Sequence, residues 1–203
     1  WDLKGPIIFF INAIGYLLTG NILGVFVIQF FTLFITLCIL YVFLREYFKP
    51  FLCTLLLLIP AASFSYGIQG GGCVEEYMLP WLAGSYYAIW KWVNSIENKG
   101  IHYHPSRYAF LYGVTFAFAL LTRLTNALGI CAAIAIIIGY LVCEKKWLNL
   151  FHNAISFIIG FLVLSVPFVV YFWAKGALYE MWYGTILYNI DYLTESDRGL
   201  KSI

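Results

Sequence analysis

Charged residues are scarce in this sequence. They make up 11% of the 203 residues, whereas hydrophobic residues make up 63%. A water-soluble domain of this length could not enclose so much apolar surface within a single core. The composition therefore excludes an ordinary soluble protein and indicates an integral membrane protein, with lipid as the solvent of its apolar surface.

The sequence also offers no cysteine framework and no nucleotide-binding loop. Its five cysteines include no C-x-x-C pair, so neither a disulfide framework nor a zinc site is indicated. Gly70-Gly71-Gly72 has no Lys-Ser or Lys-Thr after it, which excludes a phosphate-binding loop of the nucleotide type. His102 and His104 have no carboxylate or cysteine partner beside them, and we expect no metal site there.

Long apolar runs fill most of the chain. In the run from Ile22 to Leu44 the only polar side chains are Gln29, Thr32 and Thr36. At about 1.5 Å per residue, a helix of this length crosses a hydrocarbon layer of roughly 30 Å. We predict an all-α bundle of six membrane spans. Their ranges are 22–44, 51–68, 73–93, two spans within 108–143, and 151–173.

Three segments need a separate interpretation. The run from Tyr108 to Cys143 is interrupted only around Arg123, which predicts two spans joined by a tight turn. The run from Ile7 to Leu18 is too short to cross a membrane and predicts a helix at the interface. The tail from Lys175 is rich in Tyr and Trp, which predicts an interfacial aromatic helix.

Charge alternates between the gaps of this pattern. Counting Lys91 at the far end of the third span, seven bases and three acids belong to the gaps after the first, third and fifth spans, with a net charge of +4; the remaining segments carry a net charge of −2. Cytoplasmic loops of membrane proteins are enriched in Lys and Arg. We therefore expect the basic gaps to face the cytoplasm and both termini to lie outside, as in a protein of the bacterial inner (plasma) membrane.

The chain begins at Trp1, without an initiator Met or a signal peptide. Its first residues are polar and lie outside the membrane in this topology. We expect residues 1–203 to be a single transmembrane domain that belongs to a longer membrane protein, with at least one further span before it and a C-terminal part after it.

Two places on the outer side carry charges close to apolar sequence. Glu75 and Glu76 open the third span, where they could bind a cation, accept a proton from a substrate hydroxyl, or remain solvated. Arg123 lies inside the apolar stretch 108–143. It is either a snorkelling turn residue or a permanent cation for an anionic lipid headgroup, because a guanidinium group matches phosphate.

Asp2 and Lys4 precede the short interfacial helix. Gly5-Pro6 would place the Lys4 ammonium at the N-terminal end of that helix, beside free backbone N–H groups. Such an arrangement favours an anion, although an exposed Lys is more often only solvated.

The external segments together resemble those of a known family. WDLKGPIIFFINAIG, GGGCVEEYMLPW, FALLTRLTNALG and YGTILYNIDY resemble, in the same order, external segments of the protein O-mannosyltransferase-like and aminoarabinose-transferase-like membrane glycosyltransferases. The resemblance extends over nearly the whole chain. It implies a type C glycosyltransferase fold and transfer of a sugar from a polyprenyl-phosphate donor to a glycan, lipid or protein acceptor on the outer face.

The resemblance also implies roles for individual residues. Lys4 and Arg123 would bind the phosphate of the lipid carrier, and Glu75, Glu76 and Asp2 would belong to the catalytic site. A divalent cation is a possible cofactor, and nucleic acid is not an expected partner. The principal catalytic acid of the family precedes the position of Trp1, so residues 1–203 alone are expected to be inactive.

Two other classes of protein would also fit the composition. A lipid or polysaccharide transporter, or a flippase, would carry ionisable groups near the middle of its spans and an internal repeat, and neither is evident here. A non-catalytic membrane assembly subunit would not need charges gathered on its outer face. An acidic residue following a further span upstream of Trp1 would favour the transferase.

Overall fold

The computed structural model describes residues 5–67 and 74–188. Within these ranges the chain is helical, with no β-strand. The elements are α1 (Pro6–Thr19), α2 (Leu23–Leu44), α3 (Pro50–Gly67), α4 (Val74–Lys99), α5 (Ser106–Thr122), the 3₁₀ turn η1 (Leu124–Asn126), α6 (Ala127–Cys143), α7 (Trp147–Ala174), α8 (Leu178–Trp182) and the π-helical turn η2 (Tyr183–Leu187).

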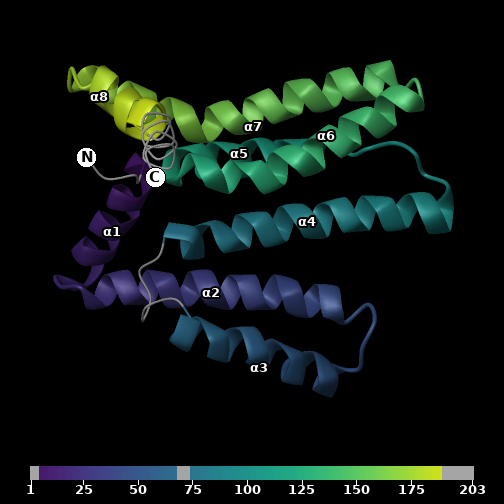
Figure 1. The fold of residues 1–203 in the computed structure, drawn as a ribbon, viewed down its shortest axis with the longest axis horizontal. Helices are drawn as coiled ribbons and strands as arrows, with labels where there is room; N and C mark the ends of the chain where they lie inside the picture. Colours follow the sequence, from purple (N-terminus) through teal and green to yellow (C-terminus); the bar gives the residue numbers. More distant parts are fainter. Residues whose placement is uncertain (1–4, 68–73, 189–203) are drawn as a thin grey trace, which may run out of the picture.

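The long helices run side by side and alternate in direction (Figure 1). Helix α5 packs against both α4 and α7, while α2 packs against α4 and carries α3 on its other side. Helix α1 is inclined to the bundle and contacts α2 and α5. It also reaches α7, where the Phe10 ring meets the rings of Phe168 and Tyr171 edge-on at centroid distances of 5.2 and 5.1 Å.

The contact between α5 and α7 depends on two glycines. A Cβ atom at Gly113 would collide with the carbonyl oxygen of Phe157, and one at Gly160 would collide with that of Phe110. Small residues allow helix backbones to approach closely where lipid, rather than water, surrounds the bundle. Helices α5 and α7 are therefore the most closely packed pair of helices in the described part of the chain.

Two clusters of buried side chains form the core. One joins α1, α4, α5 and α6 around Met78 and Ala119; the other joins α4, α5 and α6 around Ile130 and Leu141. Many large apolar side chains remain outside, including Phe30, Leu58, Ile136 and Val163, each more than half exposed. An outer surface of this kind suits contact with lipid.

Three helical segments are long and apolar enough to cross a membrane: Leu23–Leu44, Leu124–Cys143 and Trp147–Ala174. The other helices are shorter or more polar. The stretch Pro50–Ser63 within α3 is a shorter apolar segment, α5 has 17 residues, and α4 carries Glu75 and Glu76 in its first turn. The structure thus supports a helical membrane protein with three clear candidate spans.

The boundaries of the helices agree closely with the expected ones in several places. The short helix expected at 7–18 is α1, and the tight turn expected within 108–143 lies between α5 and α6. Helix α4 continues to Lys99, past the expected end at residue 93. Its last turns are polar but still helical. In the tail, α8 and η2 follow each other without a break, so the described residues from Leu178 form one short helical segment, as expected, with a π-helical turn in its second half.

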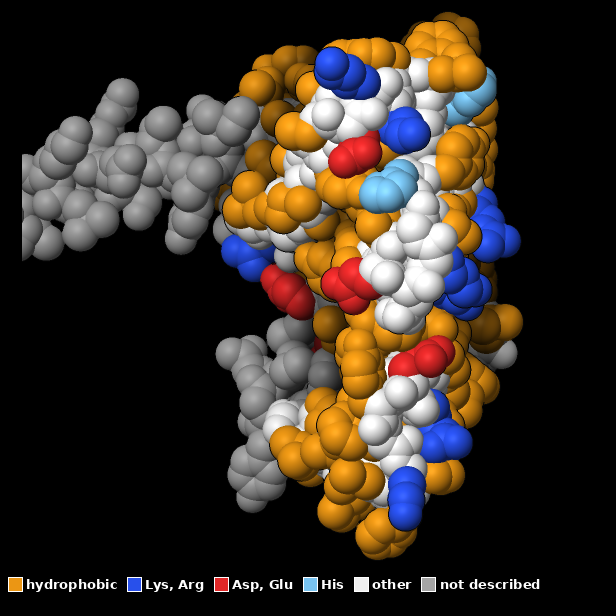
Figure 2. All heavy atoms as spheres, turned by 90° about the vertical axis from the view of Figure 1, so that its right-hand side faces the viewer, with side chains coloured by type: hydrophobic (Ala, Val, Ile, Leu, Met, Phe, Trp, Pro, Cys, Tyr) orange, Lys and Arg blue, Asp and Glu red, His pale blue; other side chains and the backbone are white. Residues whose placement is uncertain are grey.

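The alternation of the helices sorts the connections between two ends of the bundle (Figure 1). One end, here called the basic end, holds the connections 45–49, 100–105 and 144–146, which include or adjoin most of the bases assigned to the cytoplasm. Figure 2 looks onto this end and shows its Lys and Arg side chains. The opposite end, here called the Arg123 end, holds the start of α4 and the turn between α5 and α6.

Candidate functional site

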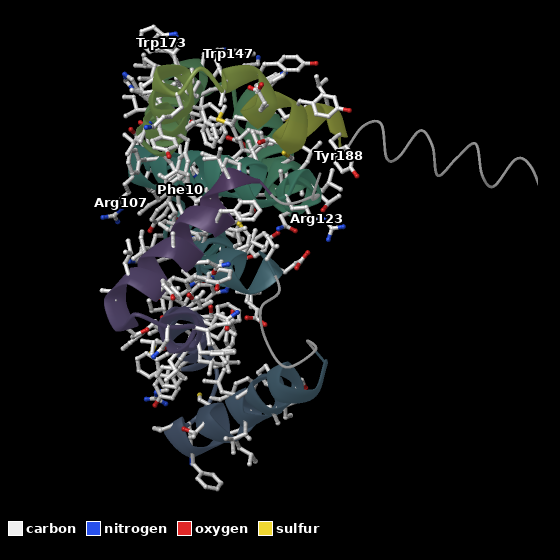
Figure 3. All side chains as sticks on the ribbon, turned by 90° about the vertical axis from the view of Figure 1, so that its left-hand side faces the viewer. Phe10, Arg107, Arg123, Trp147, Trp173 and Tyr188 are labelled. Carbon is white, nitrogen blue, oxygen red and sulfur yellow. The ribbon has the colours of Figure 1, made fainter. Side chains whose placement is uncertain are left out.

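Arg123 and Glu75 form an ion pair at the Arg123 end. The guanidinium Nη1 of Arg123 donates a hydrogen bond of 3.1 Å to Oε1 of Glu75. The side chains are 39% and 49% exposed, and Figure 3 shows Arg123 at the edge of the bundle beside the start of α4. The two charged places that the sequence singled out on the outer side therefore meet through Glu75. Because pairs this exposed stabilise a fold by only about 0–1 kcal/mol, both charges remain available to a ligand.

The backbone at the end of α5 holds Arg123 in this position. Thr122 is the last helical residue, and its buried hydroxyl bonds back to the carbonyl groups of Phe118 and Ala119. Arg123 then adopts an extended conformation, with φ −159° and ψ 126°, and its N–H still donates to the Ala119 carbonyl over 2.8 Å. The Arg123 side chain therefore leaves the helix axis and points across to α4.

Two side-chain donors beside the ion pair have no acceptor within the described ranges. They are Nε of Arg123 and Nδ2 of Asn126, and both atoms are buried. A buried donor without an acceptor costs about 1–3 kcal/mol. The α5–α6 turn thus presents unused hydrogen-bonding capacity next to a cation, a combination suited to an oxygen-rich anion.

Gly5, the residue before α1, contacts the same turn. The backbone N–H of Gly5 donates to the carbonyl oxygen of Thr122 over 2.6 Å, and a Cβ atom at Gly5 would collide with the carbonyl of Leu121. Gly5 follows Lys4 in the sequence, and Thr122 precedes Arg123. Asp2 and Lys4 themselves lie outside the described residues.

The two adjacent acids differ in environment. Glu76 is only 8% exposed, whereas Glu75 is half-exposed and reaches Arg123. The next residue, Tyr77, donates from its hydroxyl to Oδ1 of Asn12 over 3.0 Å and so ties α4 to α1. Both acids lie in the first turn of α4, where the helix dipole favours negative charge. Glu75 is therefore the acid that can meet a ligand.

An apolar cavity of about 310 Å³ opens near this turn. It lies between α5, α7 and the C-terminal elements α8 and η2, and Leu121, two residues before Arg123, forms part of its wall. The remaining lining residues are almost all apolar: Ala117, Leu120, Phe161, Leu162, Ser165, Val166, Val169, Met181, Trp182, Thr185 and Ile186. The cavity has the chemistry of a site for a hydrocarbon chain.

The histidines near the basic end have other partners than the sequence indicated. His104 is buried; its Nδ1 is 2.8 Å from Oδ1 of Asn153, and its backbone exchanges two hydrogen bonds with Asn149. Burial lowers the pKa of His104, and the hydrogen bond to Asn153 only partly opposes this effect. His104 thus acts as a neutral structural residue that fastens the α4–α5 connection to α7.

The sequence-based view of His102 needs a correction. It was expected to have no carboxylate partner, yet its Nδ1 lies 3.9 Å from Oε2 of Glu144 and 2.5 Å from the hydroxyl of Tyr140. The folding of α6 beside the α4–α5 connection brings these residues together. A signal for the His104 network was present in the sequence, since Asn149 and Asn153 stand one helical turn apart in an apolar helix.

The described part of the chain contains no group of three or more His, Cys, Asp and Glu residues that could hold a metal ion. Of the two adjacent carboxylates nearest Arg123 in the site, Glu75 already pairs with Arg123 and Glu76 is largely buried. The donor set is therefore a poor match for a cation and a better match for an anion.

No family model matches this chain, and no curated protein or solved structure is similar to it.

Proposed function

We propose that this chain is the transmembrane part of a glycosyltransferase that moves a sugar from a polyprenyl-phosphate donor to an acceptor at the Arg123 end. The observation that carries the proposal is the accessible pair of Arg123 and Glu75 beside the apolar cavity that Leu121 lines. A lipid-linked donor has a long hydrocarbon chain, a phosphate and a reactive sugar carbon. The three features of the site correspond to these three parts.

The phosphate of the donor would bind Arg123. Its oxygens would accept hydrogen bonds from the guanidinium group and from Nδ2 of Asn126. Two of these donors, Nε of Arg123 and Nδ2 of Asn126, have no acceptor among the residues described. The hydrocarbon chain would follow the cavity between α5 and α7. An incoming phosphate would replace Glu75 at Nη1 of Arg123 and release that carboxylate.

The released Glu75 carboxylate would then act as the general base. It takes the proton of an acceptor hydroxyl as the hydroxyl oxygen bonds to the anomeric carbon of the sugar. The bond between that carbon and the phosphate oxygen breaks, and polyprenyl phosphate leaves with the bonding electron pair. Arg123 stabilises the negative charge that develops on the leaving phosphate. Lys4 and Asp2 would add a second cation and a second acid from the segment that precedes Gly5.

The proposal includes a topology. The six expected spans correspond to α2, α3, α4, α5, α6 and α7, with α1 at the interface, in a type C glycosyltransferase arrangement. The basic end would face the cytoplasm of a bacterial inner membrane and the Arg123 end its outer side. The acceptor would be a glycan, a lipid or a protein that reaches this outer side.

The test is transfer of a labelled sugar from a polyprenyl-phosphate donor by the full-length protein in proteoliposomes. Arg123→Ala should raise the donor concentration needed for half-maximal rate, and Arg123→Lys should restore it only in part, because an ammonium group lacks the bidentate fork. Glu75→Gln should lower the maximal rate and leave donor binding largely unchanged.

The matched controls are Glu180→Gln in α8 and Lys175→Gln just before α8. Each removes an exposed charge near the same end. These controls should keep the wild-type rate. Wild-type transfer by every Arg123 and Glu75 variant at limiting donor would refute the site. Donor binding without transfer to any acceptor, combined with movement of the donor across the bilayer, would favour a lipid transporter instead.

A further inference from the structure

A second pocket lies at the basic end, far along the bundle from Arg123. Its volume is about 360 Å³, and it is formed by the last turns of α4, the connection to α5 and the first turn of α5. Three cations line it: Lys91 and Lys99 from α4 and Arg107 from α5. Neutral polar side chains of Asn94, Ser95 and Asn98 lie between them.

The three cations have no carboxylate within ion-pair distance in the described ranges. The acids nearest in sequence are placed elsewhere. Glu97 is exposed on α4 and is not part of the pocket wall, and Glu144 lies near His102. The pocket therefore carries three positive charges without a carboxylate partner among the described residues, and the resulting positive potential favours an anion.

Two further sources of hydrogen-bond donors belong to the elements that form the pocket. Trp92 forms part of the wall and is 4% exposed; its indole Nε1–H is buried and has no acceptor among the residues that the structure describes. The first turn of α5 begins at Ser106, and the first backbone N–H groups of a helix lack intrahelical acceptors. The positive end of the α5 dipole adds to the field of the three side chains.

The surroundings of the pocket are those of a membrane interface. Nζ of Lys91 lies 5.7 Å from the ring centre of Tyr87, and Cζ of Arg107 lies 5.2 Å from that of Tyr108. Ile101 and Tyr103, which also line the pocket, are about half-exposed. Apolar and aromatic groups beside cations match a molecule that joins a phosphate to hydrocarbon chains.

We infer that this pocket binds the phosphate group of an anionic phospholipid of the leaflet at the basic end. The inference does not depend on the proposed transferase activity, because it concerns the opposite end of the bundle. The headgroup phosphate would lie between Lys91, Lys99 and Arg107, and the acyl chains would extend along the exposed apolar side of the pocket. Bound lipid would neutralise the charge that the fold leaves unpaired.

Native mass spectrometry of the detergent-purified full-length protein tests this site. The probes are phosphatidylglycerol, which is anionic, and phosphatidylcholine, which is zwitterionic, each titrated separately. The wild-type protein should retain phosphatidylglycerol at concentrations at which phosphatidylcholine dissociates. The triple variant Lys91→Gln, Lys99→Gln, Arg107→Gln should bind phosphatidylglycerol at least about tenfold more weakly, since it removes the three bases that line the pocket and attract an anionic headgroup.

The matched control is the triple variant Lys49→Gln, Lys145→Gln, Lys146→Gln. It removes the same number of charges from the same end but none from the pocket. This control should bind phosphatidylglycerol within about twofold of wild type, and Arg107→Lys alone should keep most of the affinity. Arg107→Lys changes a single residue, so its lipid binding can be measured even if the triple variant does not fold.

Three results would overturn the inference. The first is equal phosphatidylglycerol binding by the pocket variant and the control. The second is equal retention of the two lipids by the wild-type protein. The third is displacement of phosphatidylglycerol by inorganic phosphate at about 1 mM, which would assign the pocket to a soluble phosphate rather than to a lipid.

Discussion

The backbone N–H of Gly5 donates to the carbonyl oxygen of Thr122 over 2.6 Å, so the start of the chain is fastened to the end of α5. The contact tolerates no side chain, because a Cβ atom at Gly5 would collide with the carbonyl of Leu121. This backbone contact places Gly5, the residue before α1, against the residue before Arg123. The geometry of the candidate site therefore depends on one glycine.

Gly5→Ala should separate the two segments. We expect a loss of about 1–3 kcal/mol, as for other overpacked positions, seen as a lower midpoint of thermal unfolding in detergent. Gly139→Ala is the control, since a Cβ atom there meets nothing within 4 Å and alanine favours the helix. Equal midpoints for Gly5→Ala and the wild-type protein would show that the contact is dispensable.

Exchanging the charges of the ion pair should separate its structural role from its functional one. The double variant Glu75→Arg, Arg123→Glu restores an ion pair, and its stability should lie within about 1 kcal/mol of wild type. It also moves the cation from the α5–α6 turn to α4, away from the unused donor of Asn126. Sugar transfer at limiting donor should remain lost, and recovered transfer would mean that only the ion pair matters.

The cavity near Leu121 should be sensitive to filling. Val166→Trp places an indole ring into the wall of the cavity, and it should weaken the use of long-chain donors more than that of short-chain donors. Val163→Trp is the matched control, because Val163 lies on the same helix, is 59% exposed and does not line the cavity. The measurement is the transfer rate with donors of different chain length, and equal effects of both variants would contradict the assignment.

Acidification should destabilise the α4–α5 connection through His104. Burial lowers the pKa of this histidine below its value in the unfolded chain, so the unfolded state binds more protons near pH 6. Stability should therefore fall as the pH decreases from about 7 to about 5.5, through the unfolded pKa of about 6.5. Thermal unfolding at both pH values measures this effect. His104→Gln should reduce the pH dependence, whereas an unchanged dependence would place its origin elsewhere.

The two ends of the bundle should be accessible from opposite sides of the membrane. In a variant without native cysteines, single cysteines at Lys99 and Lys145 should react with an impermeant maleimide from one side only. A cysteine at Thr125, in the turn between α5 and α6, should react from the other side. The parent without cysteines measures background labelling. Labelling of all three positions from the same side would reject the topology.

The sequence by itself determined the class of the protein and the positions of most helices. Apolar runs longer than about 20 residues can satisfy their backbone groups in lipid only as helices, so composition and length were sufficient for α2 and α7. The break around Arg123 was equally predictable, because a charged residue in the middle of a long apolar run marks the end of one span and the start of the next. The polar end of α4 was not predicted as helix, since the continuation of that helix beyond residue 93 has no apolar signal.

Only the tertiary structure distinguished Glu75 from Glu76. Adjacent residues on a helix point about 100° apart, and nothing in the sequence tells which direction faces the neighbouring helices. In the folded chain Glu76 is buried, whereas Glu75 lies beside Arg123, 48 positions away. The same limit applies to His104, whose partners lie 45 and 49 positions along the chain on α7. Contacts between segments this far apart depend on how the helices pack, and packing is decided by the shapes of whole helix faces rather than by local sequence.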